Sequence, residues 1–110
     1  MAKWLWVAEC EAATVERAEH LLLGAHAYVA YQLTGGAVAC DRTTASTTGL
    51  LAPSSDVAYC SRILKELDLD ERKLPPVLEA AAVLGTVQPA AAQQLGLPQL
   101  AGVPVIQVSE

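Results

Sequence analysis

The sequence predicts an α/β fold that is rich in helices and contains two short strands. Apolar residues recur at spacings of three or four along residues 15–33, which is typical of helices with one buried face. Residues 83–87 and 103–108 are rich in Val, and β-branched side chains favour strands. Two short strands make too small a sheet to enclose a core, so both are expected to be unpaired edges that await neighbours.

Size and composition narrow the range of partners. The chain has 110 residues, which suits one domain or part of one. A hydrophobic content of 53% and a mean hydropathy of +0.32 are high for so short a chain, and they predict exposed apolar surface and self-association. The net charge of −5 disfavours nucleic acid and anionic lipid as partners, because both are themselves negatively charged.

The spacing of cysteine and histidine residues predicts no metal site. Cys10, Cys40 and Cys60 are odd in number, far apart and without a C-x-x-C pair, so reduced and half-buried thiols are expected. His20 and His26 are six residues apart and would not share a helix face. No metal ligand is therefore predicted.

The N-terminal residues lack the features of a signal peptide, and a cytoplasmic location is expected. Residues 21–40 carry no Asp, Glu, Lys or Arg, so a membrane-spanning helix has to be considered. The Gly35–Gly36 pair would end such a helix short of the roughly 20 residues that a bilayer requires. A membrane span is therefore the disfavoured alternative.

Two consecutive helices are predicted before residue 36. Thr14 is the expected N-cap of the first, with Glu16 in its first turn, where a negative charge is favourable. The two helices are expected to hinge near Gly24, and Gly35 is expected to end the second in the left-handed conformation. One apolar stripe is predicted to run through both helices: Val15, Ala18, Leu22, Ala25, Val29 and Leu33.

Asp41 has two interpretations. As the N-cap of a helix that runs to about Leu50, its carboxylate would accept hydrogen bonds from amides of the first turn. As a functional residue, it would form a polar edge near a substrate. The sequence does not decide between the two.

The second half of the chain predicts two further helices. Residues 53–55 form a turn, Asp56 caps a helix that ends before Pro75, and Pro89–Leu95 form a helix that Gly96 ends. The first of these helices is predicted to bury one face: Val57, Cys60, Ile63, Leu64 and Leu67.

The stretch from Tyr28 to Leu51 resembles a family motif. It contains Tyr-Val-Ala-Tyr-Gln-Leu-Thr-Gly-Gly, a short spacer, and Asp-Arg-Thr-Thr-Ala-Ser-Thr-Thr-Gly-Leu-Leu. In the FGGY carbohydrate kinases this segment usually reads D-Y-x-x-Y-x-L-T-G, a few residues, and then T-D-x-x-N-A-S-x-T-x-L. The positions that agree in the second part are Asp41, Ala45, Ser46 and Thr48. The positions that differ are Ala27 in place of Asp, Cys40 in place of Thr and Thr44 in place of Asn.

Two further segments resemble the same family, in the same order. Residues 3–9 fit the end of a family signature of Lys, Trp and apolar residues, although Cys10 stands where that signature prefers an acid, an amide or His. Trp4 and Trp6 would suit a strand, or a helix that places them about 200° apart, and the resemblance favours the helix. Residues 64–77 resemble a family segment in which a helix precedes an acidic step and Leu-Pro.

The resemblance covers residues 3–108 and implies both a fold and an activity. Residues 1–110 would form the second half of the N-terminal domain, a partial ribonuclease H-like (actin-like ATPase) lobe. Kinases of this family transfer the γ-phosphoryl group of Mg-ATP to a sugar or polyol hydroxyl, whose proton is taken by a carboxylate. The residues of this chain expected to bind substrate are Asp41 and Ser46.

The resemblance implies no catalytic residue in this chain. The phosphate-binding hairpin of the family lies upstream of the matched region, and the catalytic Asp lies in a Gly-Gly-x-Asp run after a strand like residues 103–108. Gln107 stands about where the first Gly would come, and no Asp follows. ATP and Mg are therefore implied for a complete kinase, and this chain alone is expected to bind neither.

Two functions remain open. One is a fragment of an ATP-dependent carbohydrate kinase that is inactive by itself. The other is a non-catalytic interaction domain that binds a partner, such as a complementing kinase half, through exposed apolar faces. The sequence does not specify the sugar.

Overall fold

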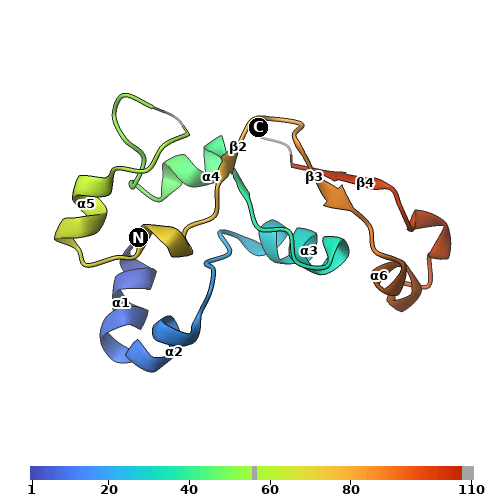
Figure 1. Cartoon of the computed structure of the whole chain (residues 1–110), viewed down its shortest axis with the longest axis horizontal. Helices are drawn as coiled ribbons and strands as arrows, with labels where there is room; N and C mark the ends of the chain where they lie inside the picture. The colour runs from blue at the N-terminus through green and yellow to red at the C-terminus, as the bar shows by residue number, and fades with distance from the viewer. Residues whose placement is uncertain (56, 108–110) are drawn as a thin grey trace.

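The computed structural model describes residues 1–55 and 57–107. The helices and strands, in chain order, are α1 (Ala2–Cys10), α2 (Ala12–Arg17), α3 (Ala25–Thr34), β1 (Cys40–Asp41), α4 (Arg42–Thr47), α5 (Ser61–Glu66), the 3₁₀ turn η1 (Glu71–Lys73), β2 (Val77–Leu78), β3 (Val83–Thr86), α6 (Pro89–Gln94), the 3₁₀ turn η2 (Pro98–Leu100) and β4 (Pro104–Ile106). Figure 1 shows an elongated molecule with α1, α2 and α5 towards one end and α6 at the other. Its principal extents are 47 × 33 × 18 Å.

Among the described residues, four short strands form two separate pairs. Strands β1 and β2 are parallel, with Cys40 opposite Val77 and Asp41 opposite Leu78. Strands β3 and β4 are antiparallel, with Val83 opposite Ile106. The expectation that the two predicted strands are unpaired is therefore wrong, because they pair with each other. Within the described residues each of them still has one unpaired edge.

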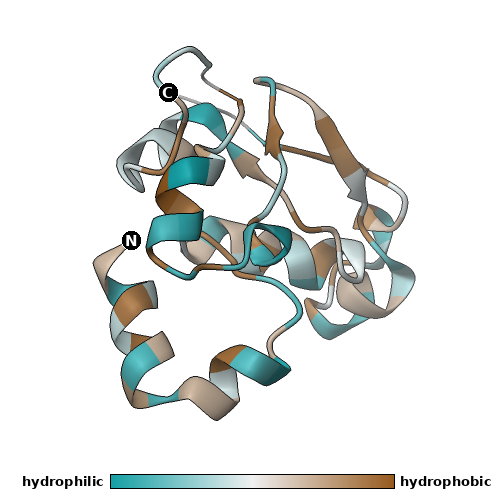
Figure 2. Cartoon of the chain, turned by 60° about the vertical axis from the view of Figure 1, so that its left-hand side comes forward, coloured by the Kyte–Doolittle hydropathy of each residue, from teal (hydrophilic) through white to brown (hydrophobic). Residues whose placement is uncertain are grey.

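The main core lies at the end of the molecule that contains α1 and α5. Its buried members are Trp4, Leu50, Leu64, Leu69 and Leu74. Trp4 is 9% exposed, whereas Trp6 is 58% exposed. This difference confirms the helical prediction for residues 3–9, because a helix turns residues two apart to different sides. Hydrophilic and hydrophobic residues both occur along α1 and α2 (Figure 2).

The predicted pair of helices before residue 36 is only partly right. Thr14 is not an N-cap, because α2 already begins at Ala12 and its N-cap is Glu11. This helix ends at Arg17, so Leu22 lies outside any helix and Gly24 is no hinge between two helices.

The early end of α2 has an identifiable cause in the fold. The Lys73 ammonium group donates to the carbonyl groups of Val15 and, at 2.8 Å, Ala18. A cation is favourable at these carbonyls because they carry the negative end of the helix dipole. The amide of Leu21 then donates to the Lys73 carbonyl at 2.7 Å, which holds residues 18–24 in a non-helical connection.

Helix α3 is bounded by two glycines with positive φ. Gly35 follows Thr34 at φ 74°, which confirms the predicted left-handed stop. Gly24 is the N-cap at φ 91°, and a Cβ there would lie 2.6 Å from the His26 ring. Val29 is 55% exposed, so its predicted place on a buried stripe is wrong.

The helix predicted from Asp56 begins later than expected. Asp56 itself lies outside the described residues, and α5 begins at Ser61. Directly before α5, Tyr59 forms an antiparallel bridge with Leu51, and the Cys60 amide donates to the Leu50 carbonyl group. These two residues are therefore paired with another segment and cannot belong to the helix. Val57 is consequently exposed. The prediction that the helix ends before Pro75 is confirmed.

Helix α6 and strand β4 lie where the sequence predicts them. Pro89 occupies the first turn of α6, and Gly96 follows its end at φ 70°. The last residue of the predicted strand, Val108, lies outside the described residues. None of the described helices is long and apolar enough to cross a membrane.

The three cysteines differ in burial. Cys10 is exposed, Cys40 is buried and Cys60 is intermediate, and all three are free thiols. The expectation of half-buried thiols therefore holds for Cys60 and is wrong for the other two.

Candidate functional site

Asp41 is the N-cap of α4 and the most buried acidic residue described, at 4% exposure. Its Oδ1 accepts a hydrogen bond from the Thr44 amide at 2.8 Å, and its Oδ2 accepts one from the Thr44 hydroxyl at 2.6 Å. The predicted capping role is therefore confirmed. The helix ends at Thr47 rather than near Leu50, because Gly49 turns the chain at φ 71°.

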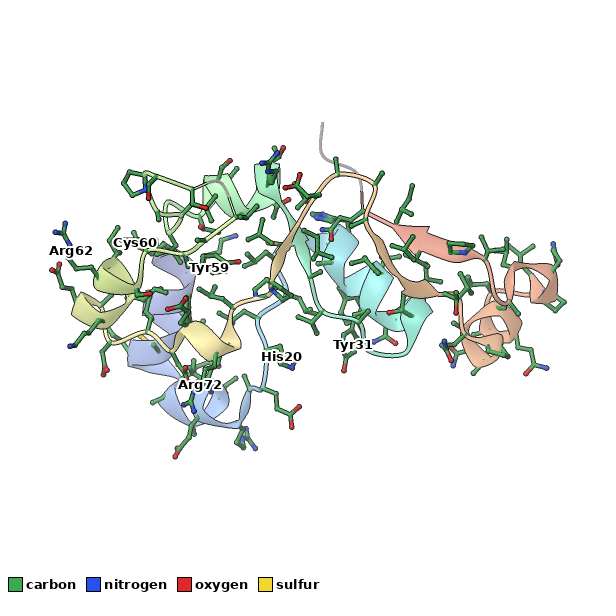
Figure 3. The ribbon with its side chains drawn as sticks, turned by 45° about the horizontal axis from the view of Figure 1, so that its top comes forward. His20, Tyr31, Tyr59, Cys60, Arg62 and Arg72 are labelled. Atoms are coloured by element: carbon green, nitrogen blue, oxygen red, sulfur yellow. The ribbon has the colours of Figure 1, made fainter. Side chains whose placement is uncertain are left out.

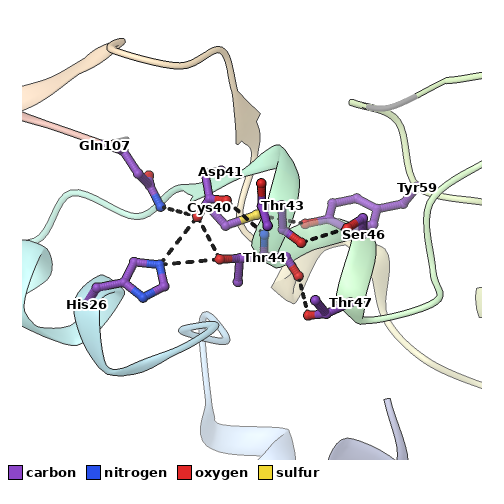
Figure 4. A network of polar contacts seen from close by, with 9 residues as sticks. All are labelled: His26, Cys40, Asp41, Thr43, Thr44, Ser46, Thr47, Tyr59 and Gln107. Atoms are coloured by element: carbon purple, nitrogen blue, oxygen red, sulfur yellow. Dashed lines mark hydrogen bonds and ion pairs between the residues drawn. The ribbon is translucent and has the colours of Figure 1, made fainter. Parts of the chain in front are cut away.

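The Asp41 carboxylate also joins two segments that are distant in the sequence. The Gln107 amide Nε2, just after β4, donates to Oδ2 at 3.4 Å, and His26 Nε2, in the first turn of α3, lies 3.4 Å from the same oxygen. Figure 4 shows these side chains converging on Asp41 from α3, α4 and the end of β4. The carboxylate is thus the meeting point of three elements, here named the Asp41 junction.

The environment of Asp41 favours its ionised form. Burial by itself would raise the pKa of the carboxyl group, but the hydrogen bonds from Thr44 and from backbone amides, together with nearby His26, hold the pKa below its usual value. An ionised carboxylate can only accept hydrogen bonds. The donor nitrogen of Gln107 must therefore face Asp41.

This orientation leaves the other end of the Gln107 amide without a partner. Gln107 is 6% exposed, and its Oε1 is buried with no hydrogen-bond partner among the described residues. A buried acceptor without a partner is unfavourable by about 1–3 kcal/mol. The hydrogen bond from Gln107 Nε2 to Asp41 Oδ2 offsets part of this cost and fixes the orientation of the amide.

A second polar contact joins Cys40 of β1 to Tyr59. The Tyr59 hydroxyl donates to the Pro75 carbonyl at 2.7 Å and lies 3.6 Å from the Cys40 sulfur. Burial raises the pKa of both the Cys40 thiol and the Tyr59 phenol. Both groups are therefore neutral at physiological pH, and they join β1 to the segment that leads into β2.

Ser46, the other predicted substrate-binding residue, lies apart from the Asp41 junction. Its side chain is exposed, and its hydroxyl donates to the Thr43 carbonyl of the same helix at 2.7 Å. The structure brings Asp41 together with His26, Thr44 and Gln107, and does not bring it together with Ser46.

Two members of the junction were not predicted from the sequence. The sequence indicates no partner for His26. Residues 21–40 contain no Asp, Glu, Lys or Arg, and His26 is their only imidazole. For Gln107, the sequence indicates only that it stands about where the family has a Gly. A signal for His26 is Gly24, since a residue with a side chain would displace the imidazole ring.

The described residues form no metal-binding site of three or more ligands. Among residues 1–55 and 57–107, no group of three or more His, Cys, Asp or Glu side chains could hold a metal ion. The junction can orient backbone segments and present the His26 ring, whose side chain is 53% exposed, to solvent.

Comparison with known proteins gives a consistent assignment. The sequence model of the N-terminal domain of the FGGY family of carbohydrate kinases matches residues 1–110. The L-fuculokinase of Salmonella typhi is 38% identical over 104 residues, which cover 94% of this chain and 21% of that protein. The chain therefore spans about a fifth of the length of this relative.

Solved structures show the same similarity. Xylulose kinase from Rhodospirillum rubrum superposes with a TM-score of 0.80 at 27% identity, over 98% of this chain and 21% of the other. Gluconate kinase from Lactobacillus acidophilus superposes with a TM-score of 0.79 at 21% identity, over 97% of this chain and 21% of the other, which shows a shared fold. The predicted helix-rich α/β lobe of the actin-like ATPase type is confirmed, and residues 1–55 and 57–107 contain four short strands in place of the two predicted. The chain belongs to the FGGY family of carbohydrate kinases.

Proposed function

We propose that this chain is the second half of the N-terminal domain of an ATP-dependent carbohydrate kinase that phosphorylates a hydroxyl group of a sugar or polyol in the cytoplasm. The observation that carries the proposal is the continuity of the similarity, which extends over 94% of the chain at 38% identity to one kinase. A likeness limited to one motif would not support a role within a kinase lobe.

The residues of this chain are proposed to act as scaffold. In a complete kinase, bound Mg-ATP supplies the phosphoryl group and neutralises part of its charge. The described residues do not fit the metal ion of this group, since no three or more of their His, Cys, Asp or Glu side chains are placed to hold one. We therefore assign no step of phosphoryl transfer to them, and propose that the 110-residue chain alone is inactive.

The Asp41 junction has a positioning role in this proposal. Both carboxylate oxygens of Asp41 already accept hydrogen bonds within the fold. A substrate hydroxyl would have to compete with these donors. The exposed Ser46 hydroxyl has fewer such constraints, and a direct contact with substrate is therefore proposed for Ser46 before Asp41.

An assay of the isolated chain tests the proposed inactivity. ADP release is measured with ATP and a panel of pentuloses, hexoses and glycerol, and no turnover above the protein-free rate is expected. Turnover that is abolished by Glu110→Gln would overturn the proposal, because it would identify a catalytic carboxylate within this chain.

The two roles of Asp41 are separated in a longer relative. The residue of the L-fuculokinase that matches Asp41 is replaced by Ala, which cannot cap the helix, and the melting temperature and the KM for the sugar are measured. A scaffold role predicts a change in melting temperature with KM nearly constant. An unchanged melting temperature with a sharply raised KM would place Asp41 in the substrate site.

A non-catalytic interaction domain is the second candidate function. Exposed large apolar side chains, such as Tyr28, Val83 and Leu95, favour it because they offer contact area to a partner. The DNA that flanks the coding region discriminates between the two functions. A reading frame that continues into kinase sequence on both sides supports the kinase, and stop codons directly at both sides support the interaction domain.

A further inference from the structure

One oxygen atom of the Asp41 junction is shared by three side chains. The Thr44 hydroxyl donates to Asp41 Oδ2 at 2.6 Å, whereas Gln107 Nε2 and His26 Nε2 each lie 3.4 Å from it. Both nitrogen atoms are thus farther from the oxygen than the roughly 2.7–3.2 Å that is usual for N–H···O hydrogen bonds. A carboxylate oxygen has two lone pairs, and Thr44 occupies one of them. The two nitrogen atoms therefore compete for the lone pair that remains.

The two competing side chains differ in their response to pH. The Gln107 amide is uncharged, and its Nε2 always donates. A neutral imidazole carries one proton, on either of its nitrogen atoms, whereas a protonated imidazole carries both and is positively charged. Charged donors bind a carboxylate at shorter distance and about twice as strongly as neutral donors. Protonation, which histidine undergoes in the physiological pH range, therefore favours His26 over Gln107.

The neighbouring elements contain few other titratable groups. Helix α3 packs against β3, β4 and α6, and none of these three ranges contains a titratable residue. Arg42, on α4, lies 3.4 Å from Glu79. Asp41 is the described carboxylate at ion-pair distance from His26. The other titratable residues of α3, of the connection before it, of β1 and of α4 are Glu19, His20, Tyr28, Tyr31, Cys40 and Arg42.

We propose that Asp41 Oδ2 is a pH-dependent switch point, which binds Gln107 while His26 is neutral and binds His26 instead once the imidazole is protonated. The buried Gln107 amide then has no partner at either end, since its Oε1 already has none among the described residues. A buried amide without a partner is unfavourable, so the end of β4 loosens. This inference rests on contacts inside the chain and does not depend on the proposed kinase function.

The loosening is expected to reach the turn between β2 and β3. The Gln107 carbonyl group accepts from the Ala81 amide at 2.9 Å, and the Gln107 amide donates to the Ala82 carbonyl group at 3.4 Å. Ala81 has φ 63°, a left-handed conformation that is unfavourable for a residue with a Cβ. Such a conformation persists only where the surrounding bonds hold it. The Ala81 amide therefore reports whether Gln107 is in place.

An NMR titration of the isotope-labelled chain from about pH 8 to about pH 5 tests the switch. As the His26 ring signals titrate, the signals of the Gln107 side-chain amide should shift with the same midpoint. The protection factor of the Ala81 amide against hydrogen exchange should fall roughly two- to tenfold, which corresponds to the loss of one hydrogen bond. The Thr44 amide should stay protected, because it donates to Asp41 Oδ1 and takes no part in the competition.

His26→Gln removes the group that takes up the proton, so the pH response of Gln107 and Ala81 should disappear in this variant. The matched control is His20→Gln, which replaces the other of the two histidines. Figure 3 shows His20 on the connection before α3, where it lines a pocket with Tyr31. This control is expected to leave the response unchanged.

Several results would overturn the proposal. One is a set of Gln107 and Ala81 signals that stay constant while His26 titrates. Another is a response that persists in His26→Gln, or that is lost equally in His20→Gln. A third is a Gln107 side-chain amide that exchanges at the unprotected rate already at about pH 8, because the chain would then lack its bond to Asp41. None of these results bears on the proposed phosphorylation of a sugar.

Discussion

Replacing Asp41 by Ala is expected to destabilise the chain through two separate losses. The first is the N-cap of α4, since Ala cannot accept from the Thr44 amide, and its loss costs about 1 kcal/mol. The second is the hydrogen bond to Gln107, whose buried Nε2 would then have no partner, at a cost of about 1–3 kcal/mol. Together the free energy of unfolding should fall by about 2–4 kcal/mol.

Thermal unfolding converts this free energy into a temperature. With an unfolding entropy of about 2.1 cal/mol/K per residue, 110 residues lose about 4 °C of melting temperature for each kcal/mol. Asp41→Ala should therefore melt roughly 9–17 °C lower than the unmodified chain. All variants are compared at one protein concentration, because association would itself raise the melting temperature.

Two further variants separate the contributions. Asp41→Asn keeps a good cap, and its amide can donate to Gln107 Oε1 if the Gln107 amide turns over, so a loss below about 1 kcal/mol is expected. In a Gln107→Leu background no donor is left without a partner, and Asp41→Ala should then cost only the cap, about 1 kcal/mol. Equal costs of Asp41→Ala in the two backgrounds would refute the coupling between Asp41 and Gln107.

The remaining predictions concern the stop of α3, the core and acid stability. Gly35→Val forces a β-branched residue to φ 74° and brings its Cβ 3.0 Å from Gln88, so unfolding measurements should show a loss of at least about 1–2 kcal/mol, while a neutral result would contradict the left-handed stop. Leu64→Ala removes a side chain that is 2% exposed and should cost about 2–5 kcal/mol in denaturant titrations; a loss below about 1 kcal/mol would show that this core is loosely packed. Because the folded state lowers the pKa of Asp41, its ionised form adds stability that is complete above the unfolded pKa of about 3.9 and disappears as the pH falls through the folded pKa. The difference in stability between the unmodified chain and Asp41→Asn should therefore shrink on acidification, and a constant difference from pH 7 to pH 2 would contradict this assignment.

The features that the sequence predicted correctly depend on a few neighbouring residues. An N-cap acts on the amides two or three residues later, and a left-handed Gly acts on the helix directly before it, so Asp41 and Gly35 could be assigned locally. The strands at residues 83–86 and 104–106 were likewise visible as β-branched runs.

The features that were missed depend on contacts between distant residues. The bond from Gln107 to Asp41 spans 66 positions, and no local pattern indicates it. Lys73, which is 58 residues after Val15, donates to the Val15 carbonyl group at the end of α2. This distant contact ends the helix, although the apolar periodicity of residues 15–22 predicts that it continues. Strands β1 and β2 contain two residues each, too few for any alternation to be recognised.

A chimeric kinase tests the central claim most directly. The segment of the Salmonella typhi L-fuculokinase that matches this chain is replaced by residues 1–110, and ATP-dependent phosphorylation of L-fuculose is measured beside the intact enzyme and the isolated chain. If the chain is the scaffold of a kinase N-terminal lobe, the chimera should fold and phosphorylate the sugar, while the isolated chain should not. A chimera that melts cooperatively, like the intact enzyme, but has no turnover would contradict the claim.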